Sequence, residues 1–248
     1  HCYPDKMFQW GYFPATRYYR NNELREHKAG SGTVDIAGAG RMIALKHPEY
    51  AIRLAETLKS AGIDFRLHMV GDGAMMNSLR QMVCSLSLTG EVEFYGSMEP
   101  DKVRQVMEQS HIFLFTSNYL EGWGAVVNEA MNSGCALVAS TEAGSVPFLI
   151  RNGINGLTYA NGSYSEFEAQ ALYLVRHPLE RSRMGQKAYE TITACWNAEH
   201  AAKELLRFCE GIVNNKKAVP AKEGPLSRAD ILAPPGMMRT LQEDNHLQ

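Results

Sequence analysis

The most constraining feature of this 248-residue sequence is a regular alternation, from Thr33 onward, of short apolar runs and helical patterns. Runs such as Phe65–Val70 are typical of buried strands, and the segments between them repeat apolar residues at helical spacing. Strands that alternate with helices predict an α/β fold with a Rossmann-like, doubly wound parallel sheet and flanking helices. The predicted strands are Thr33–Ala37, Phe65–Val70, Val92–Tyr95, His111–Thr116, Ala136–Ser140 and Gly156–Tyr159.

Helices are predicted between these strands and after the last of them. In a parallel sheet of this kind the turns that follow the strands gather at one edge, and ligands bind there. Small residues dominate those turns, so we expect the functional residues at that edge. The predicted helices lie within Pro48–Ala61, Met75–Leu86, Asp101–Gln109, Ala125–Ser133, Gly144–Arg151, Ser163–Val175, Glu180–Thr193 and Asn197–Ile212.

The chain divides into three predicted regions. Residues 1–32 are aromatic and polar without clear periodicity, and we expect them to be the remnant of an interdomain linker. Residues 33–213 form the α/β domain, and residues 214–248 form a polar C-terminal tail rich in Lys and Pro. Because the sequence opens without an initiator Met, we expect it to be a piece of a longer protein.

Composition excludes several classes of function. A net charge of −2 gives no basic field for nucleic acid. The five Cys residues are odd in number and scattered, and no two of them have metal-type spacing. This pattern favours a reduced, cytosolic compartment. The His residues show no metal-type spacing, and no apolar run approaches the roughly 20 residues that span a bilayer. Gly38-Ala-Gly40 begins like a dinucleotide fingerprint, but Ile43 replaces the third Gly, so NAD is not expected.

The segment Glu121-Gly-Trp-Gly-Ala-Val-Val-Asn-Glu129 carries two carboxylates eight positions apart around a glycine-rich turn. The turn joins a predicted strand to a predicted helix, so it offers unpaired backbone N–H groups to an anion such as phosphate. A carboxylate accepts hydrogen bonds and suits the hydroxyl groups of a vicinal diol. Phosphate and diols together predict a nucleotide-sugar.

Two residues of this segment have alternative interpretations. Glu129 lies roughly 130° from the centre of the apolar face of its predicted helix, so its position alone predicts a solvated residue. Trp123, between two glycines, is either part of the site or a hydrophobic lid over the edge of the sheet. Glu121 lies in the turn, where a helix does not need it.

The other turns carry weaker signals. Arg41, after Gly40, and Lys46 either neutralise a diphosphate or are solvated surface charges. Gly71 and Gly96 follow strands; Gly96 would let a flat base approach the backbone, although a plain turn is an equal alternative. The turn at residues 141–147 either lines a sugar pocket or only starts a helix, with Ser145 as N-cap.

In combination, these motifs resemble the C-terminal, donor-binding domain of the group-1 retaining glycosyltransferases (family 4, GT-B architecture). The resemblance covers roughly Thr33 to Ile212. The motifs that carry it are Gly40-Arg41 with Lys46, Val70-Gly71-Asp72-Gly73, Tyr95-Gly96, the Glu121 and Glu129 pair with Ala130-Met131 and Gly134, and Gly153-Ile-Asn-Gly156-Leu157.

The resemblance implies a role for each motif. Arg41 and Lys46 would grip the donor diphosphate and stabilise its growing charge as the sugar leaves, without an obligatory metal or other cofactor. Glu121 would contact hydroxyls of the transferred sugar, and Glu129 would hold the ribose. The remaining donor-binding positions implied are Gly40, Gly71, Tyr95, Gly96, Gly122, Trp123 and the backbone N–H groups of Gly124, Ala125 and Val126.

The family implies transfer with retention to a glycan or lipid-linked acceptor, in the cytoplasm, with at most peripheral contact at the inner membrane face. A UDP-sugar is the favoured donor, although no side chain in these motifs selects the base. The acceptor-binding N-terminal domain is missing, so we expect this chain to bind donor but to turn over poorly alone. Phe148 follows Pro147 where the family usually has an acidic residue, which weakens the assignment of that turn.

Two other hypotheses remain open at this point. The first is a nucleotide-sugar epimerase of the same architecture, which would need general acid and base residues at the sugar carbon. The second is a non-catalytic nucleotide-binding module.

Overall fold

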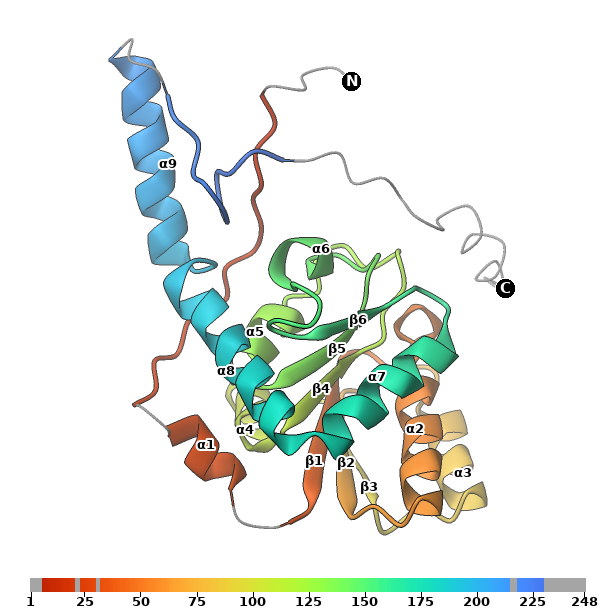
Figure 1. Cartoon of the computed structure of the whole chain (residues 1–248). Coiled ribbons are helices and arrows are strands. Elements are labelled where there is room, and N and C mark those ends of the chain that lie inside the picture. Colours follow the sequence, from red (N-terminus) through yellow and green to blue (C-terminus); the bar gives the residue numbers. More distant parts are fainter. Residues whose placement is uncertain (1–5, 21–22, 30–31, 215–217, 230–248) are drawn as a thin grey trace.

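The computed structural model describes residues 6–20, 23–29, 32–214 and 218–229 of the chain. Six parallel strands form one sheet in the order β3-β2-β1-β4-β5-β6, with helices on both faces (Figure 1). The predicted fold class is confirmed. The strands are β1 (Val34–Ala39), β2 (Phe65–Val70), β3 (Val92–Gly96), β4 (Ile112–Phe115), β5 (Ala136–Ser140) and β6 (Leu157–Tyr159).

The helices fall close to the predicted segments, with two additions. One is a helix within the predicted linker, and the other is a short 3-10 helix after β1. The helices are α1 (Glu23–Lys28), the short 3-10 helix η1 (Ala44–Lys46), α2 (Glu49–Ser60), α3 (Met76–Ser85), α4 (Pro100–Gln109), α5 (Val126–Asn132), α6 (Val146–Leu149), α7 (Tyr164–Arg176), α8 (Pro178–Ala194) and α9 (Ala198–Val213).

Strand β1 runs two residues further than predicted. Gly38 and Ala39 continue the parallel pairing with β2, opposite Met69 and Val70. Two small residues gave no strand signal in the sequence, because the pattern of bulky apolar residues stops at Ile36.

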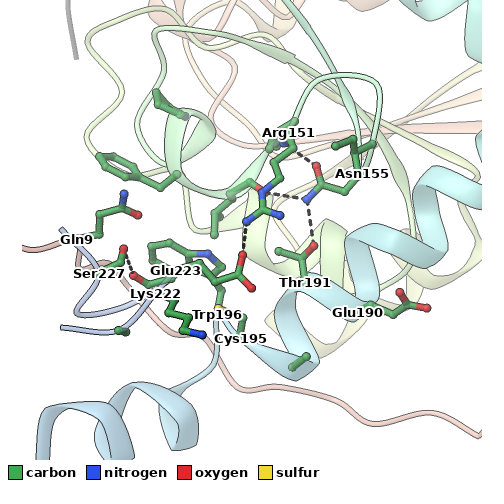
Figure 2. Close-up of a pocket in the computed structure, with 18 of the residues that line it drawn as sticks. Gln9, Arg151, Asn155, Glu190, Thr191, Cys195, Trp196, Lys222, Glu223 and Ser227 are labelled. Carbon is green, nitrogen blue, oxygen red and sulfur yellow. Dashed lines mark hydrogen bonds and ion pairs between the residues drawn. The ribbon is translucent and has the colours of Figure 1, made fainter. Parts of the chain in front are cut away.

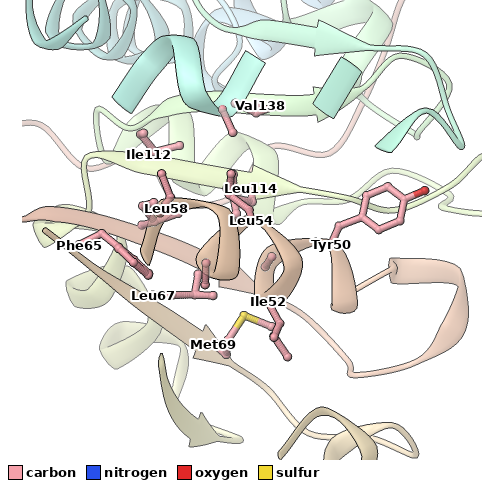
Figure 3. Packing of buried hydrophobic residues seen from close by; sticks show 14 of the residues in the cluster. Tyr50, Ile52, Leu54, Leu58, Phe65, Leu67, Met69, Ile112, Leu114 and Val138 are labelled. Atoms are coloured by element: carbon pink, nitrogen blue, oxygen red, sulfur yellow. The ribbon is translucent and has the colours of Figure 1, made fainter. Parts of the chain in front are cut away.

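One face of the sheet is buried by α2, α3 and α7. Leu67 of β2 and Leu114 of β4 point to this face, towards Leu54 and Leu58 of α2 (Figure 3). Ile36 of β1 belongs to the same hydrophobic cluster. These side chains are almost completely excluded from water, and such burial is the main favourable term in folding.

The opposite face is buried by α4, α5, α6 and α8. Alternate residues of the same strands point there, for example Ala37 of β1 and Phe113 of β4. Helix α8 crosses close to α5, and Gly185 of α8 lies against the backbone at Gly134. Burial on both faces explains why the central strands read as continuous apolar runs.

The order of the strands reverses at the centre of the sheet. The chain adds β2 and β3 on one side of β1 and then β4, β5 and β6 on the other side. The turns after β1 and β4 therefore leave neighbouring strands in opposite directions, which opens a crevice between them.

The described part of the predicted linker packs on the domain. Segment 6–20 runs past α8 and α9 towards α1 (Figure 1). The Arg17 backbone exchanges hydrogen bonds of 2.7 and 2.9 Å with the Asn132 side chain, and the Arg17 guanidinium binds Glu108 of α4. The boundary at residue 32 stays a prediction.

The described part of the predicted tail also meets segment 6–20. Gln9 and residues 226–227 exchange backbone hydrogen bonds of 2.9 Å, and Phe8 forms an isolated bridge with Arg228. Residues 230–248 lie outside the described residues.

The close approach of α8 gives a test of the packing. A Cβ on Gly185 would lie 2.3 Å from the Gly134 carbonyl oxygen, so a Gly185→Ala variant must shift the helix. We expect it to lower the free energy of unfolding by about 1–3 kcal/mol, although Ala is the better helix former by about 1 kcal/mol. Denaturant titration measures this, with Gly90→Ala as control, because a Cβ there meets no atom within 4 Å. Equal stability of the two variants would contradict the packing.

Candidate active site

The turns after β1 and β2 lie against each other at the carboxyl edge of the sheet. Gly40 N–H donates to the Val70 carbonyl, and Met42 N–H donates to the Asp72 carbonyl, both at 2.9 Å. A Cβ on Gly71, whose φ is +123°, would lie 1.9 Å from the Gly40 carbonyl oxygen. Only glycine fits there, so Gly71 acts in positioning the turn that carries Arg41.

Arg41 is an exposed cation at the rim of this edge. Within the described residues its guanidinium makes no hydrogen bond or ion pair. A guanidinium presents a planar fork of donors that matches a phosphate. The residue is therefore placed for an anion that approaches the edge from solvent.

Lys46 and Glu121, which are 75 residues apart in sequence, form an ion pair at the crevice between β1 and β4. Both side chains are largely buried, with exposed fractions of 18% and 15%. Ser117, just after β4, donates a second hydrogen bond of 3.0 Å to the same Glu121 oxygen. The structure thus brings together the predicted cation and the predicted sugar-contacting carboxylate.

Two further contacts fix the backbone on either side of this ion pair. The Thr116 hydroxyl donates to the Lys46 carbonyl at 2.6 Å, and the Asn118 N–H donates to the Leu45 carbonyl at 2.8 Å. No sequence motif predicted a role for Thr116, Ser117 or Asn118. The only available signal was their position directly after the β4 strand.

The glycine turn that follows β4 leads into α5. Gly124 has φ +72°, and a Cβ on it would lie 2.5 Å from the Phe115 ring, so the turn is pressed against the end of β4. Val127 N–H makes the first hydrogen bond of the helix, to the Gly124 carbonyl at 2.9 Å. The N–H groups of Gly124, Ala125 and Val126 precede it and have no intrahelical acceptor. Gly122 is exposed, with open space around its Cα.

The Trp123 ring packs within a group of aromatic side chains. It stacks on Phe148, with ring centroids 5.9 Å apart, and its indole N–H donates to Asn128 at 2.9 Å. Phe148 thus uses the position where the family usually has an acid to pack against Trp123. The placement matches a hydrophobic role for the ring, while the Trp123 backbone remains part of the turn.

Glu129 lies half-buried on α5, facing α4. Burial raises the pKa of its carboxyl group, and the nearby cations Arg104 and Arg17 offset part of that shift. Within the described residues no hydrogen bond to the Glu129 carboxylate is present. The helical position had suggested a solvated residue, but α4 and segment 6–20 cover that side of α5.

Tyr95 and Gly96 end β3 next to the same edge. The Gly96 carbonyl accepts a hydrogen bond of 2.8 Å from Gly71 N–H, which joins this turn to the one after β2. The Tyr95 hydroxyl instead lies along the sheet, where it bonds His68 at 2.9 Å and Glu93 at 2.7 Å. Burial and the Glu93 carboxylate raise the pKa of Tyr95 to about 12. The backbone here faces the edge, and the phenol does not.

The turn after β5 closes the edge. Ser145 N–H donates to the Trp123 carbonyl at 2.7 Å, and a Cβ on Gly144 would lie 2.3 Å from that carbonyl oxygen. Ser145 precedes α6, but its hydroxyl makes no capping hydrogen bond and is buried without a partner among the described residues. Ser145 therefore occupies the predicted N-cap position, but its side chain does not cap the helix.

The described part of the chain shows neither a metal-type cluster nor a membrane-spanning helix. There, no group of three or more His, Cys, Asp or Glu side chains is arranged to hold a metal ion. None of the helices in those residues combines the length and apolarity required to cross a bilayer.

A doubly wound sheet with cations and a carboxylate at its reversal point has the arrangement in which open α/β domains bind ligands. The model of the protein family described as glycosyl transferases group 1 matches residues 20–191 of this chain. The chain belongs to this family of transferase enzymes.

Curated relatives match part of this chain. It is 28% identical over 155 residues to the N-acetyl-alpha-D-glucosaminyl L-malate synthase of Bacillus anthracis, which covers 62% of this chain and 40% of that protein. It is 39% identical over 120 residues to the phosphatidylinositol N-acetylglucosaminyltransferase gpi3 subunit of Schizosaccharomyces pombe, covering 48% and 26%. The chain thus spans less than half the length of these relatives.

Solved structures share the fold. TarM of S. aureus, in complex with UDP and alpha-GlcNAc-glycerol, superposes with a TM-score of 0.63 at 23% identity, covering 72% of this chain and 36% of that one. The C-terminal domain of LpcC, a glycosyl transferase group 1 protein of Francisella tularensis, gives 0.62 at 22% identity, covering 75% and 96%. This coverage is consistent with a C-terminal domain.

The raised pKa of Glu129 predicts a pH-dependent stability difference. A carboxyl whose pKa is raised in the folded state destabilises the fold when ionised, so this cost is complete above the raised pKa. It disappears as pH falls below the ordinary value of 4.5. A Glu129→Gln variant should therefore be more stable than the parent at neutral pH, and the gap should close in acid. Thermal unfolding at several pH values measures this gap; a gap that widens in acid would contradict the burial of Glu129.

Proposed function

We propose that this chain is the donor-binding half of a retaining glycosyltransferase that moves a sugar from a nucleotide-sugar to a glycan or lipid-linked acceptor. The observation that carries the proposal is the Lys46–Glu121 ion pair at the reversal point of the sheet, beside Arg41, which has no ion-pair partner in the described part of the chain. Membership of the glycosyl transferases group 1 family supplies the reaction class.

In this proposal the two cations hold the diphosphate. Arg41 approaches it from the rim, and Lys46 approaches it from the crevice. As the bond to the sugar breaks, negative charge grows on the leaving diphosphate, and fixed positive groups stabilise that charge most in a site with little water. The largely buried Lys46 ammonium meets this condition.

Glu121 has two tasks in the proposal. Without donor it neutralises Lys46, and with donor its carboxylate accepts hydrogen bonds from hydroxyls of the transferred sugar. The Ser117 hydroxyl donates to this carboxylate in the structure and is proposed to keep it in place when the donor binds. Glu129, further along α5, is proposed to hold the ribose, and the Gly96 backbone is proposed to border the base.

The proposed donor is UDP-N-acetylglucosamine. Curated relatives from Bacillus and from yeasts are named for N-acetylglucosaminyl transfer, and TarM and the pneumococcal GtfA were solved with UDP. The Anabaena protein HepE was solved with UDP-glucose, so UDP-glucose is the second donor to test.

The proposal extends to the setting of the reaction. The four described cysteines, Cys84, Cys135, Cys195 and Cys209, are free thiols, which supports a reducing, cytoplasmic location. At most peripheral membrane contact is proposed as well. The acceptor site is proposed to lie in an N-terminal domain, because the chain spans under half of its curated relatives.

Calorimetry with UDP, GDP and ADP tests the proposal. Loss of charge-assisted hydrogen bonds should weaken UDP binding by about 1.5–3 kcal/mol in an Arg41→Ala variant. Arg207→Ala is the matched control, since Arg207 lies on α9 and pairs with Glu204 there. Absence of binding to every nucleotide would favour a different module.

With the complete protein, an isomerised donor would indicate an epimerase, and free UDP with glycosylated acceptor would indicate transfer.

Nucleotide binding should not depend on a divalent metal. Arg41 and Lys46 supply the positive charge that a metal ion provides in other sites, so we expect the UDP affinity to be equal in EDTA and in Mg²⁺. Calorimetric titrations under the two conditions check this. A UDP affinity that falls more than about tenfold in EDTA, equivalent to about 1.4 kcal/mol, would contradict it.

A further inference from the structure

All three tryptophans of the chain lie in one aromatic cluster beside the candidate site. The cluster, here called the tryptophan cluster, draws on four separate segments of the chain. Its members are Trp10, Tyr12 and Phe13 of segment 6–20, Trp123 of the glycine turn, Phe148 of α6 and Trp196 after α8.

Trp123 is the central member of the tryptophan cluster. Its ring lies 5.9 Å from Phe148, 6.0 Å from Tyr12 and 6.4 Å from Trp196 between centroids. Aromatic pairs at such distances stabilise a structure beyond the effect of the area that they bury. Phe148 and Trp196 also line a cavity of about 620 Å³ (Figure 2). The ring therefore lies between the turn and three other segments.

The contact between Trp123 and segment 6–20 is tight. A Cβ built on Gly11 would lie 2.2 Å from two carbons of the Trp123 ring, so only glycine allows this approach. The Trp123 indole N–H donates to Asn128 at 2.9 Å, and the Asn128 amide reaches the Tyr12 carbonyl at 3.4 Å. Asn128 is buried, so its side chain has a fixed set of partners.

The backbone of Trp123 is equally constrained. Its carbonyl accepts the 2.7 Å hydrogen bond from Ser145 N–H, and it lies two residues after Glu121 and one before Gly124. Any displacement of the ring is therefore transmitted to the turn that carries Glu121 and the free N–H groups before α5. Sites of this kind lose affinity when their supporting contacts loosen, even if no ligand contact is removed.

We propose that Trp123 is a positioning residue: its ring ties the glycine turn to segment 6–20, so that donor affinity depends on how that segment packs. This inference rests on the proposed function, because it concerns the affinity of the same site. Coupling of this kind is reciprocal. A bound nucleoside diphosphate therefore stabilises the packing of segment 6–20 by as much as that packing favours binding. Because all three tryptophans lie in the tryptophan cluster, tryptophan fluorescence can measure this coupling.

A Gly11→Ala variant tests the proposal without changing any residue of the candidate site. The added Cβ displaces the Trp123 ring, and we expect the dissociation constant for UDP to rise by roughly 2- to 30-fold. Gly90→Ala is the matched control and should bind UDP like the parent, since its Cβ meets no atom within 4 Å. Binding is measured by calorimetry well below the unfolding midpoint of each variant, which separates positioning from loss of fold.

A second pair of variants covers the case in which Gly11→Ala does not fold. Tyr12 and Tyr18 are both exposed residues of segment 6–20, at 67% and 64%, and of the two only Tyr12 has a ring contact with Trp123 among the described residues. Tyr12→Leu should weaken UDP binding in the same direction as Gly11→Ala, by a smaller factor. Tyr18→Leu should leave UDP binding unchanged.

Two readouts report the coupling directly. UDP should change the tryptophan emission of the parent chain and should slow chymotrypsin cleavage at the aromatic residues of segment 6–20. Both effects should shrink in Tyr12→Leu and in Gly11→Ala if it folds.

The possible results separate the two hypotheses. If the parent binds none of UDP, GDP and ADP, the proposed function fails. If the parent binds UDP and Arg41→Ala weakens this binding, the function stands. In that case, the positioning role would be overturned if Gly11→Ala kept the UDP affinity and the UDP-induced emission change of the parent. If Gly11→Ala does not fold, the same result in Tyr12→Leu would overturn it.

Discussion

The reversal of strand order between β1 and β4 is the constraint on which the rest of the site depends. Neighbouring strands whose chains leave in opposite directions cannot close the gap between their turns, so the carboxyl edge stays open there. Glycines then let the adjoining turns touch backbone to backbone, as Gly71 does against Gly40. The crevice is a product of topology first and of side chains second.

The charges in the crevice follow from its limited contact with water. A lysine and a glutamate that are both largely buried are costly unless each has a partner, and Lys46 and Glu121 satisfy each other. Arg41 remains at the exposed rim, where a free guanidinium costs little. The site thus has a neutralised ion pair in the crevice and a cation at the rim. This arrangement suits a ligand with both an anionic and a hydroxyl-bearing part.

The tryptophan cluster gives the glycine turn a rigid support. Glycines alone would leave the turn with many conformations, because they lack the steric limits of other residues. Trp123 removes this freedom by anchoring its ring on Phe148 and Trp196. Phe148 replaces the acidic residue that the family usually has there, and the stacking explains what an apolar ring does in its place.

The sequence by itself determined the fold class and the approximate bounds of its elements, because strand and helix periodicities are local properties of the chain. It also predicted which turns carry the candidate site residues. Only the tertiary structure decided which side chains meet: Lys46 with Glu121, Tyr95 with His68, and Trp123 with Gly11. It also decided that Glu129 is half-buried rather than solvated, because α4 and segment 6–20 cover it. Contacts between residues far apart in sequence depend on how the layers pack, and no local pattern encodes that.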